Sequence, residues 1–180
     1  MTDFDVLNQI EYGSHLYQFY KTIDEYVASL GIFFRTGLSK GEACIWLVDD
    51  AMGIKRVQQL AEKIIPDFLL ALCTGQMNML SANEWYLTQG NFDEEKAVVN
   101  AKTCIQKMLD KGYPAIRGAG DTAAIPKKER YKLEVYESRM NQMIKGLPVI
   151  GVCAYPIDDC SLNEVHQVIT NHDHRIINRR

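Results

Sequence analysis

Hydrophobic and polar positions follow two alternating periods along the chain, and this alternation predicts strands separated by helices. The segments 42–50 and 148–156 each contain an apolar run of strand length, and the first one ends in two carboxylates, Asp49 and Asp50. Such runs are typical of a parallel sheet covered on both faces. Shorter apolar or aromatic runs predict further strands at 15–20, 77–87 and 114–121, the last one breaking into a glycine-rich turn at 118–121.

The segments between these strands carry apolar residues at three- and four-residue steps, which predicts helices. Thr22 with Glu25, and Ser161 with Glu164, have the spacing of a capping box, and Asn91 or Asp93 lies at the start of a third helix. Pro66 interrupts the second helical segment, which predicts two shorter helices, and Pro126 suits the first turn of another. The predicted helical segments are 22–41, 52–76, 91–113, 126–147 and 161–180.

Strands that alternate with helices of this length indicate βαβ units. We therefore predict an α/β fold, a three-layer sandwich with a mainly parallel central sheet flanked by helices. The 180 residues contain no repeat, low-complexity tract or linker, which favours a single domain over 1–180.

Composition narrows the classes of partner. The chain is 47% hydrophobic and 24% charged with a formal net charge of -3, which gives no general attraction to nucleic acid or to an anionic membrane. It has no apolar stretch long enough to span a bilayer and no secretory signal at its N-terminus. Its five cysteines, an odd number without a CxxC pair, indicate reduced thiols and hence a cytoplasmic location.

The expected position of a site follows from the fold class, because ligands of open α/β sheets bind beyond the carboxyl ends of the strands. The residues at the predicted strand ends are mainly aromatic rings and carboxylates, with Arg117 nearby. They are Phe19, Tyr20, Lys21, Asp49, Asp50, Glu84, Trp85, Tyr86, Asp121, Tyr155 and Asp158, together with the range 118–120.

Phosphate chemistry is not indicated at these ends. A Walker A loop requires GxxxxGK[ST], because its backbone N–H groups and lysine neutralise the phosphate charge, and the chain contains no such string. The segment 117–123, RGAGDTA, contains only GxG, which a tight strand-to-helix turn explains. Nucleotide hydrolysis and dinucleotide binding are therefore not expected.

Metal and nucleophile chemistry are also not indicated by spacing. His172 and His174 lie in a predicted helix, where residues two apart point away from each other and would not share an ion. His15 and Cys153 would meet if their strands were neighbours, but a hydrogen-bonded core histidine and a buried cysteine are the simpler interpretation. Cys153 stands inside a strand rather than at an exposed elbow. We predict no catalytic residue, metal or cofactor.

Four strings occur in an order that resembles one known family: GSHLYQFY at 13–20, RGAGD at 117–121, VCAYPID at 152–158 and NHDHRI at 171–176. Together they resemble the methanogen/methylotroph DcmR-type sensory domain, called MEDS, over Tyr12 to Ile176. Family sequences commonly read D-H-x-C-x-F-Y at the first string. Here Ser14 precedes His15, and Tyr17 stands where the cysteine is usual.

The resemblance implies a RecA-like fold without its phosphate loop, and a non-enzymatic sensor of small hydrocarbon derivatives such as halogenated or methylated one-carbon compounds. It implies partners of two kinds: a small apolar or methylated ligand, and a histidine kinase or transcription regulator acting in trans. A homodimer is a further option. No direct contact with nucleic acid or membrane is expected.

A small neutral ligand requires apolar walls and a few orienting polar groups. The residues that we expect to supply them are His15, Tyr17, Phe19, Tyr20, Arg117, Asp121, Cys153, Tyr155 and His172. Alternation in the first strand places His15, Tyr17 and Phe19 on one face and Tyr20 on the other, so only one of these two sets lines a given pocket.

Two other functions stay open from the residues. One is a degenerate nucleotide-binding regulator, whose phosphate ligands would be Arg117, Lys127, Lys128 and the turn at 118–121. The other is a metal- or haem-dependent redox sensor that uses His15, Cys153, or His172 with His174.

Overall fold

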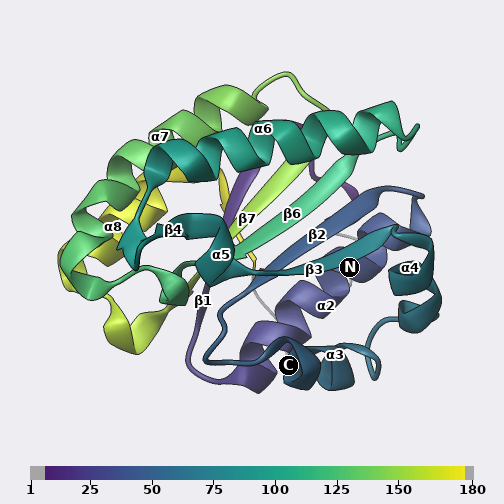
Figure 1. The fold of residues 1–180 in the computed structure, drawn as a ribbon, viewed down its shortest axis with the longest axis horizontal. Coiled ribbons are helices and arrows are strands. Elements are labelled where there is room, and N and C mark those ends of the chain that lie inside the picture. Colours follow the sequence, from purple (N-terminus) through teal and green to yellow (C-terminus); the bar gives the residue numbers. More distant parts are fainter. Residues whose placement is uncertain (1–6, 177–180) are drawn as a thin grey trace.

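A parallel sheet lies between two layers of helices in the computed structural model, which describes residues 7–176 (Figure 1). The sheet has six strands in the order β3-β2-β6-β7-β1-β8, and all its pairings are parallel. The predicted α/β sandwich is therefore confirmed. Within 7–176, no helix combines the length and the apolar character that crossing a membrane requires.

The strands of the main sheet fall close to the predicted runs. Their bounds are β1 His15–Tyr20, β2 Ala43–Val48, β3 Met77–Ser81, β6 Ile116–Asp121, β7 Val149–Pro156 and β8 His174–Arg175. A separate antiparallel hairpin consists of β4 Leu87–Thr88 and β5 Asn91–Phe92.

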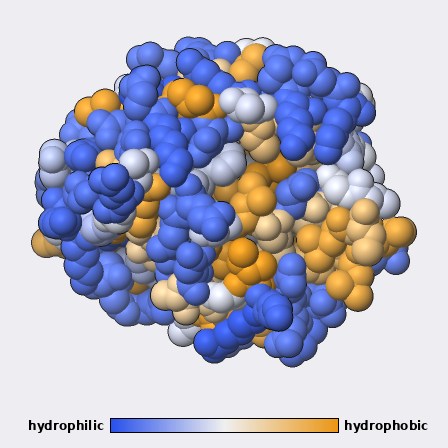
Figure 2. Space-filling view, in the orientation of Figure 1, coloured by the Kyte–Doolittle hydropathy of each residue, from blue (hydrophilic) through white to orange (hydrophobic). Residues whose placement is uncertain are grey.

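One helical layer contains α2 Ile23–Ser39, α3 Ile54–Ala61 and α4 Phe68–Thr74, and the other contains α5 Ala82–Tyr86, α6 Glu94–Asp110, α7 Leu133–Ile144 and α8 Leu162–Asn171 (Figure 1). Short 3-10 turns complete the chain at Thr122–Ala124, Lys127–Lys132 and Ile157–Asp159. Figure 2 shows that apolar side chains reach the surface over α4 and beside β3, where Leu69, Leu70 and Leu80 are exposed.

Local capping explains where several helices begin. The Thr22 hydroxyl accepts from the backbone N–H of Glu25 and starts α2, although the Glu25 carboxylate accepts from Lys21 rather than closing the box on Thr22. At α8 both halves of the capping box form between Ser161 and Glu164. Of the two candidates for α6, Asp93 is the cap, since its side chain accepts from the N–H of Lys96.

The largest differences from the predictions concern four segments. The strand predicted at 77–87 ends at Ser81, because the Ser81 hydroxyl caps the short helix α5. The predicted turn at 118–121 is wrong: these residues continue β6, which pairs with β2 on one side and β7 on the other. The helix predicted from 126 begins with a 3-10 segment and becomes α-helical at Leu133. The last helix ends at Asn171, and the chain then pairs with β1 through β8; residues 177–180 of that prediction lie outside the described part.

A buried ion pair lies between the sheet and α2. The Arg117 guanidinium, in β6, donates through Nε to the Glu42 carboxylate, and neither side chain is exposed to solvent. Arg117 also lies over the Phe33 ring at 5.0 Å and donates to the backbone carbonyl of Leu7. Glu42 accepts a second hydrogen bond from the Tyr12 hydroxyl. Arg117 therefore links β6 to Phe33 of α2, to Glu42 and to the backbone of Leu7.

We predict strong coupling between these two charges. Glu42→Gln leaves the Arg117 charge buried without a counter-ion, and should lower the free energy of unfolding by about 3–5 kcal/mol. The double variant Glu42→Gln/Arg117→Met should lose clearly less than the sum of the two single variants, because it buries no unpaired charge. Urea denaturation of the four proteins measures this, and additive losses would contradict it.

Candidate functional site

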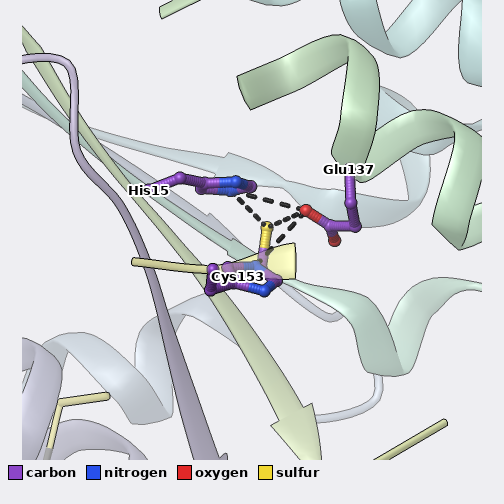
Figure 3. Close-up of side chains that lie close together, drawn as sticks. His15, Glu137 and Cys153 are labelled. Atoms are coloured by element: carbon purple, nitrogen blue, oxygen red, sulfur yellow. Dashed lines mark hydrogen bonds and ion pairs between the residues drawn. The ribbon is translucent and has the colours of Figure 1, made fainter. Parts of the chain in front are cut away.

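Four buried side chains converge between the sheet and α7. They are His15 of β1, Cys153 of β7, Glu137 of α7 and His172, which directly follows α8. Figure 3 shows Glu137 pointing from its helix toward His15 and Cys153 on the sheet. The ring centroids of His15 and His172 are 4.3 Å apart. Since β1 and β7 are hydrogen-bonded neighbours, the sheet itself places His15 beside Cys153.

The contacts inside this cluster are short. His15 Nε2 lies 3.3 Å from Cys153 Sγ and 3.4 Å from Glu137 Oε2. Cys153 Sγ donates to Glu137 Oε2 at 3.4 Å. His172 Nε2 is also 3.4 Å from Glu137 Oε2, but it makes no hydrogen bond among the described residues. One carboxylate oxygen thus contacts all three other groups.

An outer set of hydrogen bonds orients these groups. His15 Nδ1 bonds with Asn141 Oδ1 at 2.7 Å, and the amide nitrogen of Asn141 donates to the carbonyl of Asn171, which fixes the orientation of the amide. His172 Nδ1 donates to the carbonyl of Val168. The Tyr155 hydroxyl donates to the other oxygen of Glu137. Both imidazoles therefore carry a proton on Nδ1 and present Nε2 to the cluster.

Electrostatics in the cluster are set by burial and by mutual contact. Burial by itself would raise the pKa of Glu137, but the adjacent His172 and His15 outweigh it and lower that pKa to about 2. Burial would lower the pKa of His172, but the Glu137 carboxylate raises it above its ordinary value. For His15 burial prevails and lowers the pKa. Burial and the Glu137 charge raise the pKa of the Cys153 thiol.

A cavity of about 80 Å³ lies next to this cluster, between the sheet and the helices α5, α6 and α7. Apolar side chains form most of its wall, and His15 and Cys153 border it at the cluster end. Three glycines line its sheet side. A Cβ atom at Gly120 would collide with the Tyr86 hydroxyl, whereas a Cβ at Gly118 would meet no atom within 4 Å. Gly118 therefore leaves space open in the cavity wall. The remaining lining residues include Ile45, Leu47, Trp85, Cys104, Met140 and Gly151.

The structure divides the predicted ligand residues between the two faces of the sheet. Tyr17 and Tyr155 pack around His172, with ring centroids 5.5 and 6.0 Å from its ring. Phe19 lies 5.9 Å from Tyr155 on the same face. With His15, Cys153 and His172, these residues form one group. Tyr20, Arg117 and Asp121 lie on the opposite face, in the layer of α2.

On that opposite face, the region where a phosphate loop would lie is closed. Only Lys21 and Thr22 separate β1 from α2, far fewer residues than the GxxxxGK[ST] loop contains. The Tyr20 hydroxyl donates to the Asp121 carboxylate at 2.8 Å, and Asp121 also accepts from the N–H of Ala123. Arg117 is committed to Glu42, and Lys127 pairs with Asp159 at the surface. These groups do not converge on a common phosphate position.

Glu137 was not among the predicted site residues, although it lies at the centre of the cluster. A sequence signal for it exists. Leu133, Tyr136, Met140 and Ile144 form the apolar stripe of α7, and Glu137 stands inside that stripe. A carboxylate at a core-facing helical position must be paired with another group, which marks it as a site candidate.

Comparison with solved structures identifies the fold. The fold is similar to that of a KaiC-like protein from Pyrococcus horikoshii, with a TM-score of 0.63 and 10% identity over 91% of this chain and 69% of that one. It is also similar to the flagellar accessory protein FlaH from Methanocaldococcus jannaschii, with a TM-score of 0.51 and 11% identity over 94% and 74% of the two chains. The chain therefore has a RecA-like α/β fold.

The family is defined by sequence. Residues 14–173 match the MEthanogen/methylotroph, DcmR Sensory domain, so the chain belongs to the MEDS family. No curated protein sequence matches the chain. The match confirms the resemblance carried by the four strings and assigns the chain a sensory or signalling role in general terms.

We predict that Asp121 makes stability depend on pH. Burial, together with the charge of Asp49, raises the pKa of this carboxyl from 3.8 to about 7 despite its hydrogen bonds. Because the folded protein holds the Asp121 proton more tightly than the unfolded chain does, protonation of this carboxyl stabilises the fold. This contribution is fully present below pH 3.8 and is lost as the pH rises through about 7. Asp121→Asn keeps an acceptor for Tyr20 without this titration. Relative to that variant, the wild type should lose on the order of 1–3 kcal/mol of unfolding free energy between pH 5 and pH 8. Urea denaturation at several pH values measures the unfolding free energy of both proteins. The prediction would be contradicted if that free energy changed with pH equally in the wild type and in Asp121→Asn.

Proposed function

We propose that this domain senses a small, mainly apolar compound, a hydrocarbon derivative of the methylated or halogenated one-carbon type, which binds in the cavity beside His15 and Cys153. Occupancy is relayed to a regulator or kinase in trans. The observation that carries the proposal is the cavity: it is apolar, it holds open space over Gly118, and it has two polar side chains at one end.

The size of the cavity supports this class of ligand. A volume of about 80 Å³ exceeds the roughly 10–15 Å³ that one water requires and accommodates a molecule of a few non-hydrogen atoms. It is too small for a nucleotide or a haem, whose pockets fall in the range of roughly 300–1,000 Å³. A small neutral molecule gains its affinity from apolar contact, and the lining of this cavity is suited to that.

The relay has a physical basis in the walls of the cavity. One side is formed by the hydrogen-bonded strands β2, β6 and β7, and the other side by residues of α5, α6 and α7. A ligand that fills the space binds better to one packing of these helices than to another and shifts the balance between them. The outer surface of α7 and α8, where Val135, Leu162 and Ile169 are exposed, would present the change to a partner.

Affinity is expected to be modest, because the best small ligands gain at most about 1.5 kcal/mol per non-hydrogen atom. Dichloromethane is a suitable probe and should bind in the millimolar range. At about ten times its Kd, it should raise the melting temperature of the wild type by about 3–5 °C. Gly118→Val fills the open space from the sheet side and should abolish this shift.

Two further variants locate the effect. Cys104→Leu adds volume from the α6 wall and should weaken the shift, whereas Cys73→Leu, on exposed α4, should leave it unchanged. Differential scanning fluorimetry and circular dichroism measure binding and fold together. An undiminished shift in a folded Gly118→Val protein would place the ligand elsewhere. Shifts with nucleotides and with no one-carbon compound would refute the sensory proposal.

A further inference from the structure

The donor atoms of the buried cluster have the arrangement of a metal site. His15 Nε2, Glu137 Oε2, Cys153 Sγ and His172 Nε2 all lie within 4.8 Å of one another. Four of the distances between them are 3.3 or 3.4 Å. Bonds of about 2.0–2.3 Å from a tetrahedral zinc ion place its ligands about 3.3–3.6 Å apart. The cluster is thus close to the shape of a four-coordinate shell.

We propose that His15, Glu137, Cys153 and His172 bind one divalent transition-metal ion, with Zn²⁺ as the ion that fits the donor set best. Two imidazoles, one thiolate and one carboxylate are ordinary zinc ligands. The mixture of nitrogen and sulfur donors excludes Mg²⁺ and Ca²⁺, which require oxygen ligands. This site goes beyond the sensory function and does not depend on it.

The outer hydrogen bonds provide independent support. Histidines that ligate metals donate their other ring N–H to a carbonyl or carboxylate oxygen, which fixes the tautomer and orients the ring. His15 bonds in this way with Asn141, and His172 with the carbonyl of Val168. The second oxygen of Glu137 accepts from Tyr155. Each of these ligands thus has its non-ligating atom occupied and its ligating atom directed inward.

The charges and protons also balance. A thiolate and a carboxylate carry two negative charges, which neutralise a divalent ion inside a buried site. Binding releases the Cys153 thiol proton and any proton on His15 or His172 to solvent, without an oxidant or reductant. Without a metal ion, the buried Glu137 carboxylate relies for compensation on the Cys153 thiol proton and on a protonated imidazole of His15 or His172. Among the four donor atoms, His172 Nε2 is buried without a hydrogen bond.

A metal here would connect distant parts of the chain. Its ligands come from β1, α7, β7 and the segment after α8, so one ion would join the sheet to the helical layer of α5, α6, α7 and α8. The four side chains complete a tetrahedral shell, as in structural zinc sites. Because His15 and Cys153 also border the cavity, the ion would lie at its polar end.

Elemental analysis and cobalt spectroscopy test the site. Protein purified without chelator, or made apo and titrated with Zn²⁺, should contain about one zinc per chain by mass spectrometry. Replacement by Co²⁺ should give the visible bands of a tetrahedral ion and a near-ultraviolet thiolate-to-cobalt band. Cys153→Ser should remove the thiolate band, and His172→Gln should lower the zinc affinity at least tenfold. Zinc should raise the melting temperature of the wild type and not that of Cys153→Ser.

Matched controls come from the same chain. Cys44→Ser alters a buried thiol in the other layer, and His166→Gln alters an exposed histidine of α8, so both should bind zinc and cobalt like the wild type. The cobalt spectrum of the wild type needs no variant, so a misfolded mutant does not obscure the result. A folded wild-type protein with neither stoichiometric zinc nor a tetrahedral cobalt spectrum would overturn the proposal. The proposal would also be overturned if Cys153→Ser and His172→Gln bound zinc and cobalt as tightly as the wild type does.

Discussion

A carboxylate buried in an apolar layer requires hydrogen bonds or positive charge beside it. This requirement at Glu137 constrains the packing of α7 and of the segment after α8 on the sheet. An uncompensated charge in such a place would cost many kcal/mol. Its partners are brought from three other places in the chain, β1, β7 and the segment after α8. Asn141, one turn beyond Glu137 on α7, adds bonds to His15 and to the carbonyl of Asn171. The position of α7 on the sheet and the return of the C-terminal segment are thereby specified together.

The two faces of the sheet have separate polar chemistry. On the α2 face, Arg117 forms an ion pair with Glu42, and the Tyr20 hydroxyl donates to Asp121, so these polar groups bind one another. On the other face, the polar cluster adjoins an open cavity. The RecA-like fold is retained, but the loop that would cradle phosphate is reduced to Lys21 and Thr22. The proposed function therefore rests on the site and not on the fold, since widely used folds carry many unrelated functions.

Features governed by local sequence were predictable. β1, β2 and β7 and the caps at Thr22, Asp93 and Ser161 depend on residues adjacent in the chain, and they occur close to the predicted positions. The box predicted for Thr22 and Glu25 forms only in part, because the Glu25 carboxylate accepts from the backbone N–H of Lys21. Features governed by distant pairing were not. The glycines at 118–120 have the local character of a turn, but β2 and β7 bind them on both sides and extend the strand.

The end of α8 has the same explanation. The helical pattern of the sequence continues past Asn171. In the structure, however, the Asp173 carboxylate accepts from the backbone N–H of His15, and the backbone N–H of Asp173 donates to the His15 carbonyl. These two bonds end the helix and bring His172 into the cluster. The prediction that His172 and His174 would not share an ion assumed a continuous helix. In the structure the neighbours of His172 in the cluster are His15 and Glu137.

The cavity and the cluster share two side chains, and this sharing has a consequence for signalling. A compound in the cavity would contact His15 and Cys153, and both of these contact Glu137 on α7. A change in their positions therefore acts on α7 and, through His172, on the segment that follows α8. If the cluster holds an ion, linkage requires that the ligand and the ion alter each other's affinity by the same factor. The four residues of the cluster would then both stabilise the helical layer of α7 and α8 and transmit to it whether the cavity is occupied.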